Sequence, residues 1–99
     1  MLKKLNLPKV LGFDWDQGNL EHIKKHEVEY SECEEIFYNE PEFFYDGKHS
    51  RQEDRFLAYG ITDEHRLLTL IFTIRQNKLR VISARNQNRH ERRVFNKNI

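Results

Sequence analysis

The spacing of apolar residues predicts a first short helix near the start of the chain. Asp16 can cap a helix whose apolar positions Leu20 and Ile23 are three residues apart, and this helix should end around 25–26. The residues before it, 1–12, follow no clear period and are expected to form an extended segment.

A second helix is predicted between Ser31 and Pro41. Ser31 and Glu34 match the capping-box pattern, in which each side chain hydrogen-bonds the backbone at the start of the helix. An apolar stripe at i, i+3 and i+4 is formed by Cys33, Ile36 and Phe37. Cys33 is therefore expected to be a core residue rather than a reactive thiol. Pro41 ends the helix because it lacks a backbone donor.

Beyond Pro41 the period changes to two, which is typical of strands. Strands are predicted at 43–45, 55–61, 66–75 and 79–85, with short turns between them. Asn88, with Glu91 three residues later, is expected to cap a terminal helix. The chain thus predicts a single α+β domain over 1–99, with two N-terminal helices, a four-stranded antiparallel sheet and a C-terminal helix. The short connections place all helices on one face of this sheet.

Alternation along the longest predicted strand separates the two faces of the sheet. The even positions form an apolar set that should meet the helices, namely Leu68, Leu70, Phe72 and Ile74. The odd positions from Leu67 to Arg75 are mixed and face either solvent or a ligand. If Phe56 joins the core, Arg55 and Tyr59 share the mixed face with Arg75, whereas a register shift of one residue would invert this assignment.

Length and composition restrict the class of protein. Ninety-nine residues are enough for one modest core, and an aromatic share of 12% is too high for a typical disordered chain. No apolar run approaches the roughly 20 residues of a membrane helix, and the N-terminus lacks the pattern of a secretory signal. The single cysteine excludes an internal disulfide and a multi-thiolate zinc site. We therefore expect a folded cytoplasmic protein.

The formal net charge of +1 conceals two oppositely charged segments. Positions 27–46 contain no Lys or Arg, and their acidic residues are Glu27, Glu29, Glu32, Glu34, Glu35, Glu40, Glu42 and Asp46. In positions 75–97 the only acid is Glu91, and the basic residues are Arg75, Lys78, Arg80, Arg85, Arg89, Arg92, Arg93 and Lys97. An arginine-rich segment suits phosphate, because guanidinium is a forked donor that stays charged. The alternative is a solvated surface whose charge offsets the acidic segment.

Short motifs lie along most of the chain, from 13 to 95. They are Phe13-Asp14-Trp15-Asp16 with Asn19, Lys25-His26-x-Val28, Glu34-x-Ile36-Phe37, Asp46, His49-Ser50, Glu53-x-Arg55-Phe56, Gly60, Arg80-Val81-Ile82-Ser83-Ala84-Arg85 and Glu91-Arg92. Together their order and spacing resemble the BrnT family, the toxin half of a type II toxin–antitoxin pair. One departure is Gln87-Asn88, where the family commonly has a small residue followed by Ser or Thr.

The resemblance implies a fold similar to that of the RelE ribonuclease toxins and cleavage of RNA that arrests growth. It also implies neutralisation by an antitoxin resembling BrnA, with a ribbon-helix-helix part that binds DNA. The toxin would then contact DNA only through its antitoxin. We expect no cofactor, metal or membrane partner. Whether the toxin forms a homodimer through an uncovered sheet edge is left open.

Metal-free RNA cleavage uses the 2′-hydroxyl as nucleophile, and it needs proton transfer and stabilisation of the phosphate charge. His49 is the leading acid–base candidate, because the ordinary pKa of histidine suits proton transfer near neutral pH. Glu53 is expected either to orient His49 or to act as base, and Arg55 to grip phosphate. The alternative is an exposed turn histidine beside a surface ion pair.

Arg80 and Arg85 belong to the strongest motif and are candidate charge stabilisers, since arginine cannot serve as a base. They are five residues apart, so an uninterrupted strand places them on opposite faces. Either a bulge intervenes, or Arg85 lies past the strand end, or only one of them faces RNA; we favour Arg85 at the strand end. The alternative is that one of them pairs with an acid such as Glu91 to hold the last helix.

Further contacts to RNA are predicted for Lys25, Arg75, Arg89 and Arg92. His22 and His26 share one helical face, but no third ligand accompanies them and we predict no metal site. The function predicted from the sequence is that of an endoribonuclease toxin. The alternatives are a noncatalytic RNA- or partner-binding module and a purely structural interaction protein.

Overall fold

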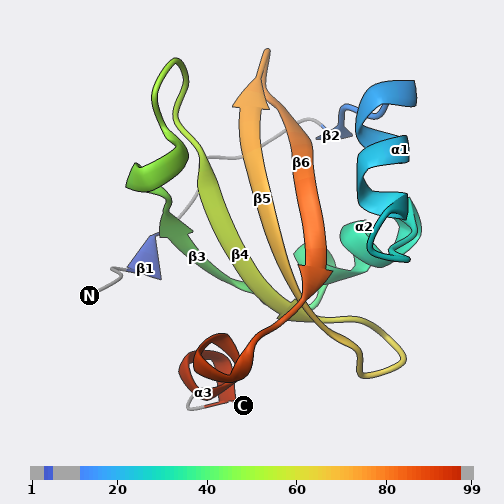
Figure 1. Ribbon diagram of the computed structural model, residues 1–99, viewed down its shortest axis with the longest axis vertical. Coiled ribbons are helices and arrows are strands. Elements are labelled where there is room, and N and C mark those ends of the chain that lie inside the picture. Colours follow the sequence, from blue (N-terminus) through green and yellow to red (C-terminus); the bar gives the residue numbers. More distant parts are fainter. Residues whose placement is uncertain (1–3, 6–11, 97–99) are drawn as a thin grey trace.

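The chain folds into a mixed β-sheet that carries helices on both faces (Figure 1). The computed structural model describes residues 4–5 and 12–96. In chain order the elements are β1 (Lys4–Leu5), β2 (Gly12–Phe13), α1 (Gln17–Lys24), α2 (Tyr30–Tyr38), β3 (Glu42–Tyr45), the 3₁₀ turn η1 (Gly47–His49), β4 (Phe56–Ile61), β5 (Leu67–Arg75), β6 (Lys78–Asn86) and α3 (Arg89–Asn96).

The four longer strands form the predicted antiparallel meander, and each bound lies within one residue of the prediction. The predicted total of four strands is wrong, because the described residues form a sheet of six strands in the order β1-β3-β4-β5-β6-β2. β1 extends one edge antiparallel to β3, and β2 extends the other edge parallel to β6. Two-residue strands are too short to show a period. The extended segment predicted at 1–12 lies mostly outside the described residues.

The even positions of β5 meet α1 and α2, as predicted. Ile23 from α1 and Ile36 from α2 are buried in one core with the apolar even positions of β5. The prediction that every helix covers this face is wrong, because α3 packs on the other one. There Phe95 of α3 is buried with Phe44 and Tyr59. The mixed face therefore has one end covered by α3, while the opposite end carries the β5–β6 turn and the segment between β3 and β4 (Figure 1).

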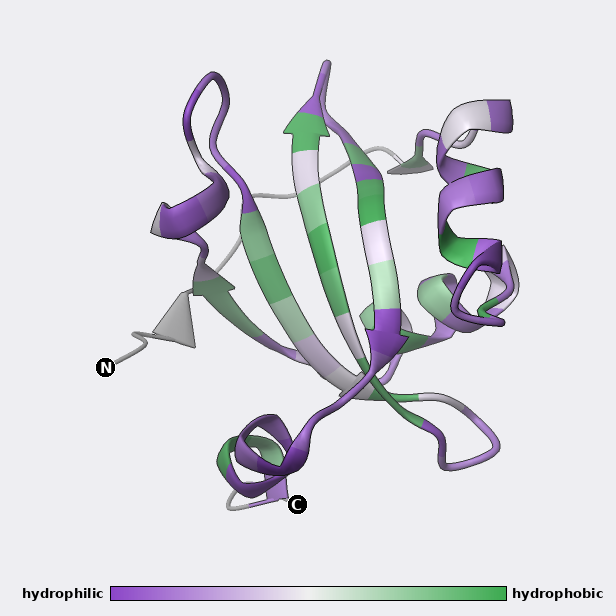
Figure 2. Cartoon of the chain, in the orientation of Figure 1, coloured by the Kyte–Doolittle hydropathy of each residue, from purple (hydrophilic) through white to green (hydrophobic). Residues whose placement is uncertain are grey.

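Hydrophobic residues are concentrated in the middle of the sheet. Figure 2 shows that the middles of the central strands are hydrophobic, whereas the loops and most of α3 are hydrophilic. On α1, Ile23 is buried as predicted, but Leu20 is 36% exposed and is not a core position. Cys33 is fully buried, and this burial raises the pKa of its thiol to about 12. The prediction that Cys33 is a core residue is confirmed.

The first and third helices begin with the predicted caps. Asp16 Oδ1 accepts from the backbone N–H of Asn19 at 3.2 Å, and Asn19 Oδ1 accepts from the N–H of Asp16 at 2.8 Å. Asn88 and Glu91 bond reciprocally in the same way, at 2.8 and 2.9 Å. These reciprocal bonds satisfy backbone donors that have no partner inside a helix.

The second helix begins at Tyr30, its capping residue lies two positions before the predicted cap Ser31, and the predicted Ser31–Glu34 capping box is wrong. Glu29 is the capping residue, and its N–H donates to Glu32 Oε1 at 3.0 Å. Glu34 instead accepts from Trp15 Nε1 at 2.9 Å. This tertiary hydrogen bond ties α2 to the segment before α1, which a local capping pattern cannot reveal.

α2 lies close to β4 at Gly60. A Cβ atom on Gly60 would lie 2.6 Å from Cγ2 of Ile36, well inside van der Waals contact. Only glycine therefore allows this separation between helix and sheet.

Candidate active site

A bulge in β6 places Arg80 and Arg85 on the same face of the sheet. The β5–β6 register shifts in the middle of the pair, so that β6 carries one additional residue. Arg80 consequently lies opposite Thr73 and Arg85 opposite Thr69, both on the mixed face. Of the alternatives considered, the bulge is confirmed, and the favoured position of Arg85 at the strand end is wrong because β6 continues to Asn86 and Arg85 is paired within it.

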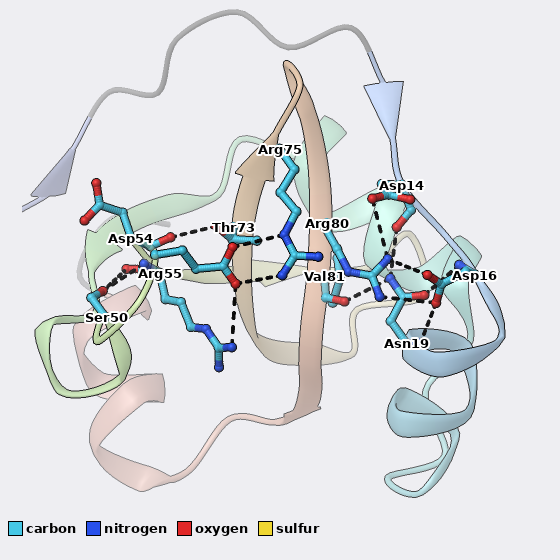
Figure 3. Close-up of polar contacts among 11 residues, drawn as sticks. Asp14, Asp16, Asn19, Ser50, Asp54, Arg55, Thr73, Arg75, Arg80 and Val81 are labelled. Atoms are coloured by element: carbon cyan, nitrogen blue, oxygen red, sulfur yellow. Dashed lines mark hydrogen bonds and ion pairs between the residues drawn. The ribbon is translucent and has the colours of Figure 1, made fainter.

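The segment between β3 and β4 is held against the mixed face by a compact set of hydrogen bonds. The N–H of Asp46 donates to the carbonyl of Arg55 at 2.8 Å. The Ser50 hydroxyl donates to the carbonyl of Asp46 at 2.6 Å and accepts from the N–H of Arg55 at 2.8 Å. Thr73 Oγ1 donates to the carbonyl of Asp54 at 2.7 Å and so attaches the segment to β5 (Figure 3).

This arrangement forms an open hollow of about 740 Å³ at the end of the sheet opposite α3. Its lining comprises Lys48, His49, Arg51, Gln52, Glu53, Arg55 and Arg75. Four residues predicted for the site, His49, Glu53, Arg55 and Arg75, are thereby brought together. The lining contains four Lys or Arg side chains and one carboxylate, so the hollow attracts anions.

His49 is oriented by Asp46. Nδ1 of His49 lies 2.7 Å from Asp46 Oδ2, and the Asp46 side chain is 9% exposed while that of His49 is 48% exposed. An ionised carboxylate only accepts hydrogen bonds, so Nδ1 carries the proton and Nε2 remains the basic nitrogen. The prediction that Glu53 orients His49 is not met. Asp46 is one of the motif residues given above, and it lies three residues before His49. This short spacing could have predicted their contact from the sequence, but it was not used.

Glu53 bonds to arginine rather than to histidine. Arg75 donates from Nε to Glu53 Oε1 at 3.0 Å and from Nη2 to Oε2 at 2.8 Å. Nη2 of Arg55 lies 3.7 Å from the same Oε2. The hydrogen bonds from Arg75 lower the pKa of Glu53 below its ordinary value, and Glu53 raises the pKa of Arg75. Glu53 is therefore ionised near neutral pH and is a weak base.

Arg80 anchors the start of α1 beside the hollow. Its guanidinium donates to Asp16 at 2.9 and 3.2 Å and lies 3.5 Å from Asp14, and its side chain is 15% exposed. The hydrogen bond from Arg80 is the largest influence lowering the pKa of Asp16. The buried amide of Asn19 adds bonds to the carbonyls of Asp14 and Val81 at 2.9 and 3.1 Å. Arg55, Arg75 and Arg80 thus lie in a row across the sheet, with Arg80 already held by two carboxylates (Figure 3).

Arg85 anchors α3, which confirms the alternative that one of the motif arginines pairs with Glu91. Its Nη1 and Nη2 donate to Glu91 Oε1 and Oε2 at 2.6 and 2.9 Å. Thr69 Oγ1 and the N–H of Asn88 each donate to the same carboxylate at 2.9 Å. Burial alone would raise the pKa of Glu91, but the hydrogen bonds from Arg85, Asn88 and Thr69 outweigh it and lower that pKa.

The remaining predicted RNA contacts lie away from the hollow. Lys25 is exposed at the C-terminal end of α1, and Arg89 is exposed on α3. Arg92 is also on α3, where its Nη1 donates to the carbonyl of Gln87 at 2.7 Å. Sequence reasoning missed Lys48, Arg51 and Gln52, which line the hollow next to His49. Their proximity to His49 along the chain could have predicted that they belong to the same site.

Two negative findings apply to the described residues, 4–5 and 12–96. They contain no group of three or more His, Cys, Asp or Glu side chains arranged to hold a metal ion. None of their helices combines the length and the apolar character that crossing a membrane requires.

The fold and the hollow together define a small α+β domain with a basic, solvent-open site on one face of its sheet. The family model described as "Ribonuclease toxin, BrnT, of type II toxin-antitoxin system" matches residues 15–91, and the chain belongs to this family. The resemblance inferred from the motifs is thereby confirmed, and the family implies an antitoxin partner and an RNA target. No curated protein and no solved structure matches the chain significantly.

Proposed function

We propose that the chain is an endoribonuclease toxin that cleaves RNA in the hollow lined by His49, Arg55 and Arg75, without a metal ion. The observation that carries this proposal is that an oriented histidine and two arginine side chains, the residue type suited to phosphate, line one open hollow. A metal-free ribonuclease needs these two functions within reach of one phosphodiester.

In the proposed reaction Nε2 of His49 takes the proton from the 2′-hydroxyl of the bound nucleotide. The 2′-oxygen attacks the adjacent phosphorus, and the bond from phosphorus to the 5′-oxygen breaks. Arg55 and Arg75 stabilise the negative charge on the phosphoryl oxygens. Water in the open hollow supplies the proton to the departing 5′-oxygen. The products are a 2′,3′-cyclic phosphate and a 5′-hydroxyl.

Asp46 has a positioning role in this mechanism, because its buried carboxylate fixes both the ring and the tautomer of His49. Arg80 and Arg85 have structural roles rather than contacts to the reacting phosphate, because Arg80 holds the start of α1 and Arg85 holds α3 through their carboxylate partners. Lys25, Arg89 and Arg92 provide at most distant contacts to the RNA backbone.

The proposal extends to the cellular context that the family resemblance implies. The chain is a single cytoplasmic toxin domain of RelE-like fold, and its partner is a BrnA-like ribbon-helix-helix antitoxin. A basic, open hollow is a surface that an acidic segment of the antitoxin can cover, which would block access of RNA.

The experiment that tests the proposal is RNA cleavage by the purified protein in EDTA, with identification of the product ends. We expect 2′,3′-cyclic or 3′-phosphate ends, and a loss of cleavage of about 100-fold or more in His49→Ala. His22→Ala is the matched control, because His22 is an exposed histidine on α1 outside the hollow. Equal cleavage by both variants would contradict the site, and intact RNA at high protein concentration would favour the noncatalytic binding module.

A further inference from the structure

The carboxylate of Glu53 occupies a position suited to a phosphate. Its Oε2 lies 2.8 Å from Nη2 of Arg75 and 3.7 Å from Nη2 of Arg55. Two guanidinium groups from different segments of the chain thus converge on one oxygen. The paired donors of a guanidinium match carboxylate and phosphate in the same way, so the geometry that holds Glu53 also fits a phosphodiester.

The contact is built so that the carboxylate can be exchanged. The side chains of Glu53 and Arg75 are 29% and 47% exposed, and Glu53 belongs to the irregular segment before β4. Both hydrogen bonds that the described residues donate to the Glu53 carboxylate come from Arg75. Rotation of the Glu53 side chain into the open hollow is sufficient to release both Arg55 and Arg75. Exposed ion pairs of this kind contribute little to stability, so replacing one by a ligand costs little free energy.

We infer that Glu53 is a resident competitor at a phosphate-binding site formed by Arg55 and Arg75, and that a phosphodiester of a nucleic acid binds there by replacing the Glu53 carboxylate. The inference rests on the proposed function for the identity of the phosphodiester. It assigns Glu53 a role in affinity rather than in proton transfer.

Competition with Glu53 at this site favours the binding of polynucleotides over that of single phosphate groups. An isolated phosphate must displace Glu53 with the contacts of Arg55 and Arg75 alone. A polynucleotide can add contacts from neighbouring phosphates to Lys48 and Arg51, which line the same hollow. Glu53 therefore raises the number of phosphates that a ligand needs in order to bind.

The test measures the affinity of the full chain for a single-stranded DNA oligonucleotide, which lacks the 2′-hydroxyl and binds without being cleaved. Fluorescence anisotropy at about 50 mM salt keeps the electrostatic contribution large. We expect Glu53→Gln to bind roughly 5-fold more tightly than the unsubstituted protein. Glu53→Ala carries the same expectation and serves if thermal unfolding shows that Glu53→Gln is not folded.

Asp54→Asn is the matched control, because it removes a neighbouring negative charge that does not contact the arginine pair. Asp54 accepts from the Tyr45 hydroxyl, and its carboxylate points away from Arg75 (Figure 3). Its affinity should stay within about 2-fold of the unsubstituted protein. In an Arg75→Ala background the gain from Glu53→Gln should also fall to within about 2-fold, because the contested guanidinium is gone.

Equal or weaker binding by the Glu53 variants overturns the inference, as does no detectable binding by any variant or a gain that persists without Arg75. Cleavage of RNA by the unsubstituted protein is measured in parallel. Cleavage without an affinity gain removes this inference and keeps the nuclease, whereas an affinity gain without cleavage keeps this inference and removes the nuclease.

Discussion

Two bidentate arginine–glutamate pairs lie on one face of the sheet, at opposite ends. In the pair of Arg85 and Glu91 the carboxylate is only 7% exposed, and it accepts further hydrogen bonds from Thr69 and Asn88. In the pair of Arg75 and Glu53 the carboxylate is 29% exposed and lies in an open hollow. The first pair fixes α3 on the sheet, and the second is available to a ligand.

The difference shows that the surroundings of an ion pair decide its role. The Glu91 carboxylate is buried, so removing Arg85 would leave it without its counterion and almost without solvent, which makes this pair a structural element. An exposed pair is screened by water, and its arginine can exchange one anion for another at low cost. The same two residue types therefore serve folding at one end of the sheet and binding at the other.

The largest expected effect on stability is that of Glu91→Ala. This substitution leaves Arg85, Thr69 and the N–H of Asn88 without their acceptor, and we expect it to lower the free energy of unfolding by about 3 kcal/mol. Urea unfolding followed by circular dichroism measures the loss. A change as small as that of Glu53→Ala would contradict the structural role of this pair.

Arg85→Lys should have an intermediate effect, because lysine keeps the charge but cannot form both hydrogen bonds to Glu91. We expect a loss of about 1–2 kcal/mol in the same unfolding experiment. Arg75→Lys is its counterpart at the exposed pair and should change the free energy of unfolding by less than about 0.5 kcal/mol. Equal losses for the two variants would remove the distinction between the pairs.

Acid should weaken the buried pair more than the exposed one. The pKa of Glu91 in the folded chain is lowered from its ordinary value of 4.5, so its contribution is complete above that value and is lost as the pH falls through the folded pKa. We expect the stability lost between about pH 6 and about pH 3 to be smaller in Glu91→Gln than in the unsubstituted protein. Glu53→Gln, the matched control, should change that loss less. The reverse order would show that the exposed pair dominates the acid response.

The smallest expected effect is that of Glu53→Ala on stability. Its ion pairs are partly exposed, so the free energy of unfolding should change by no more than about 0.5 kcal/mol. Thermal unfolding is a sufficient check. A large loss would mean that Glu53 holds the segment before β4 in place and is not free to exchange.

The sequence predicted the parts of the fold that depend on local periodicity. The meander, the caps at Asp16 and Asn88 and the burial of Cys33 follow from patterns spanning a few residues. The two-residue edge strands have no pattern of their own. The position of α3 depends on Phe95 meeting Phe44 and Tyr59, which are distant in the sequence. The predicted box at Ser31 failed because Glu34 has a tertiary partner in Trp15.

The site was predictable only as a set of residue types. His49, Glu53, Arg55 and Arg75 could be selected because histidine and arginine suit phosphate chemistry, and they line one hollow. The partners of the arginines could not be selected in this way. For Arg80 and Arg85, one additional residue in β6 decides that they share a face of the sheet. The pair of Arg85 and Glu91, six residues apart, was among the alternatives. The pair of Arg75 and Glu53, 22 residues apart, is set by tertiary distance, and it separates an arginine open to a ligand from one that holds the structure.

The most direct test of this account compares RNA cleavage by Arg75→Ala and Arg85→Ala at equal concentrations of folded protein. The account predicts that Arg75→Ala loses cleavage by about 10-fold or more, since its interaction with the reacting phosphate is removed. It should keep its stability, because the fold loses only the exposed ion pair with Glu53. Arg85→Ala should lose stability and keep cleavage close to that of the unsubstituted protein wherever it is folded. Full cleavage by Arg75→Ala, together with loss of cleavage in folded Arg85→Ala, would contradict the account.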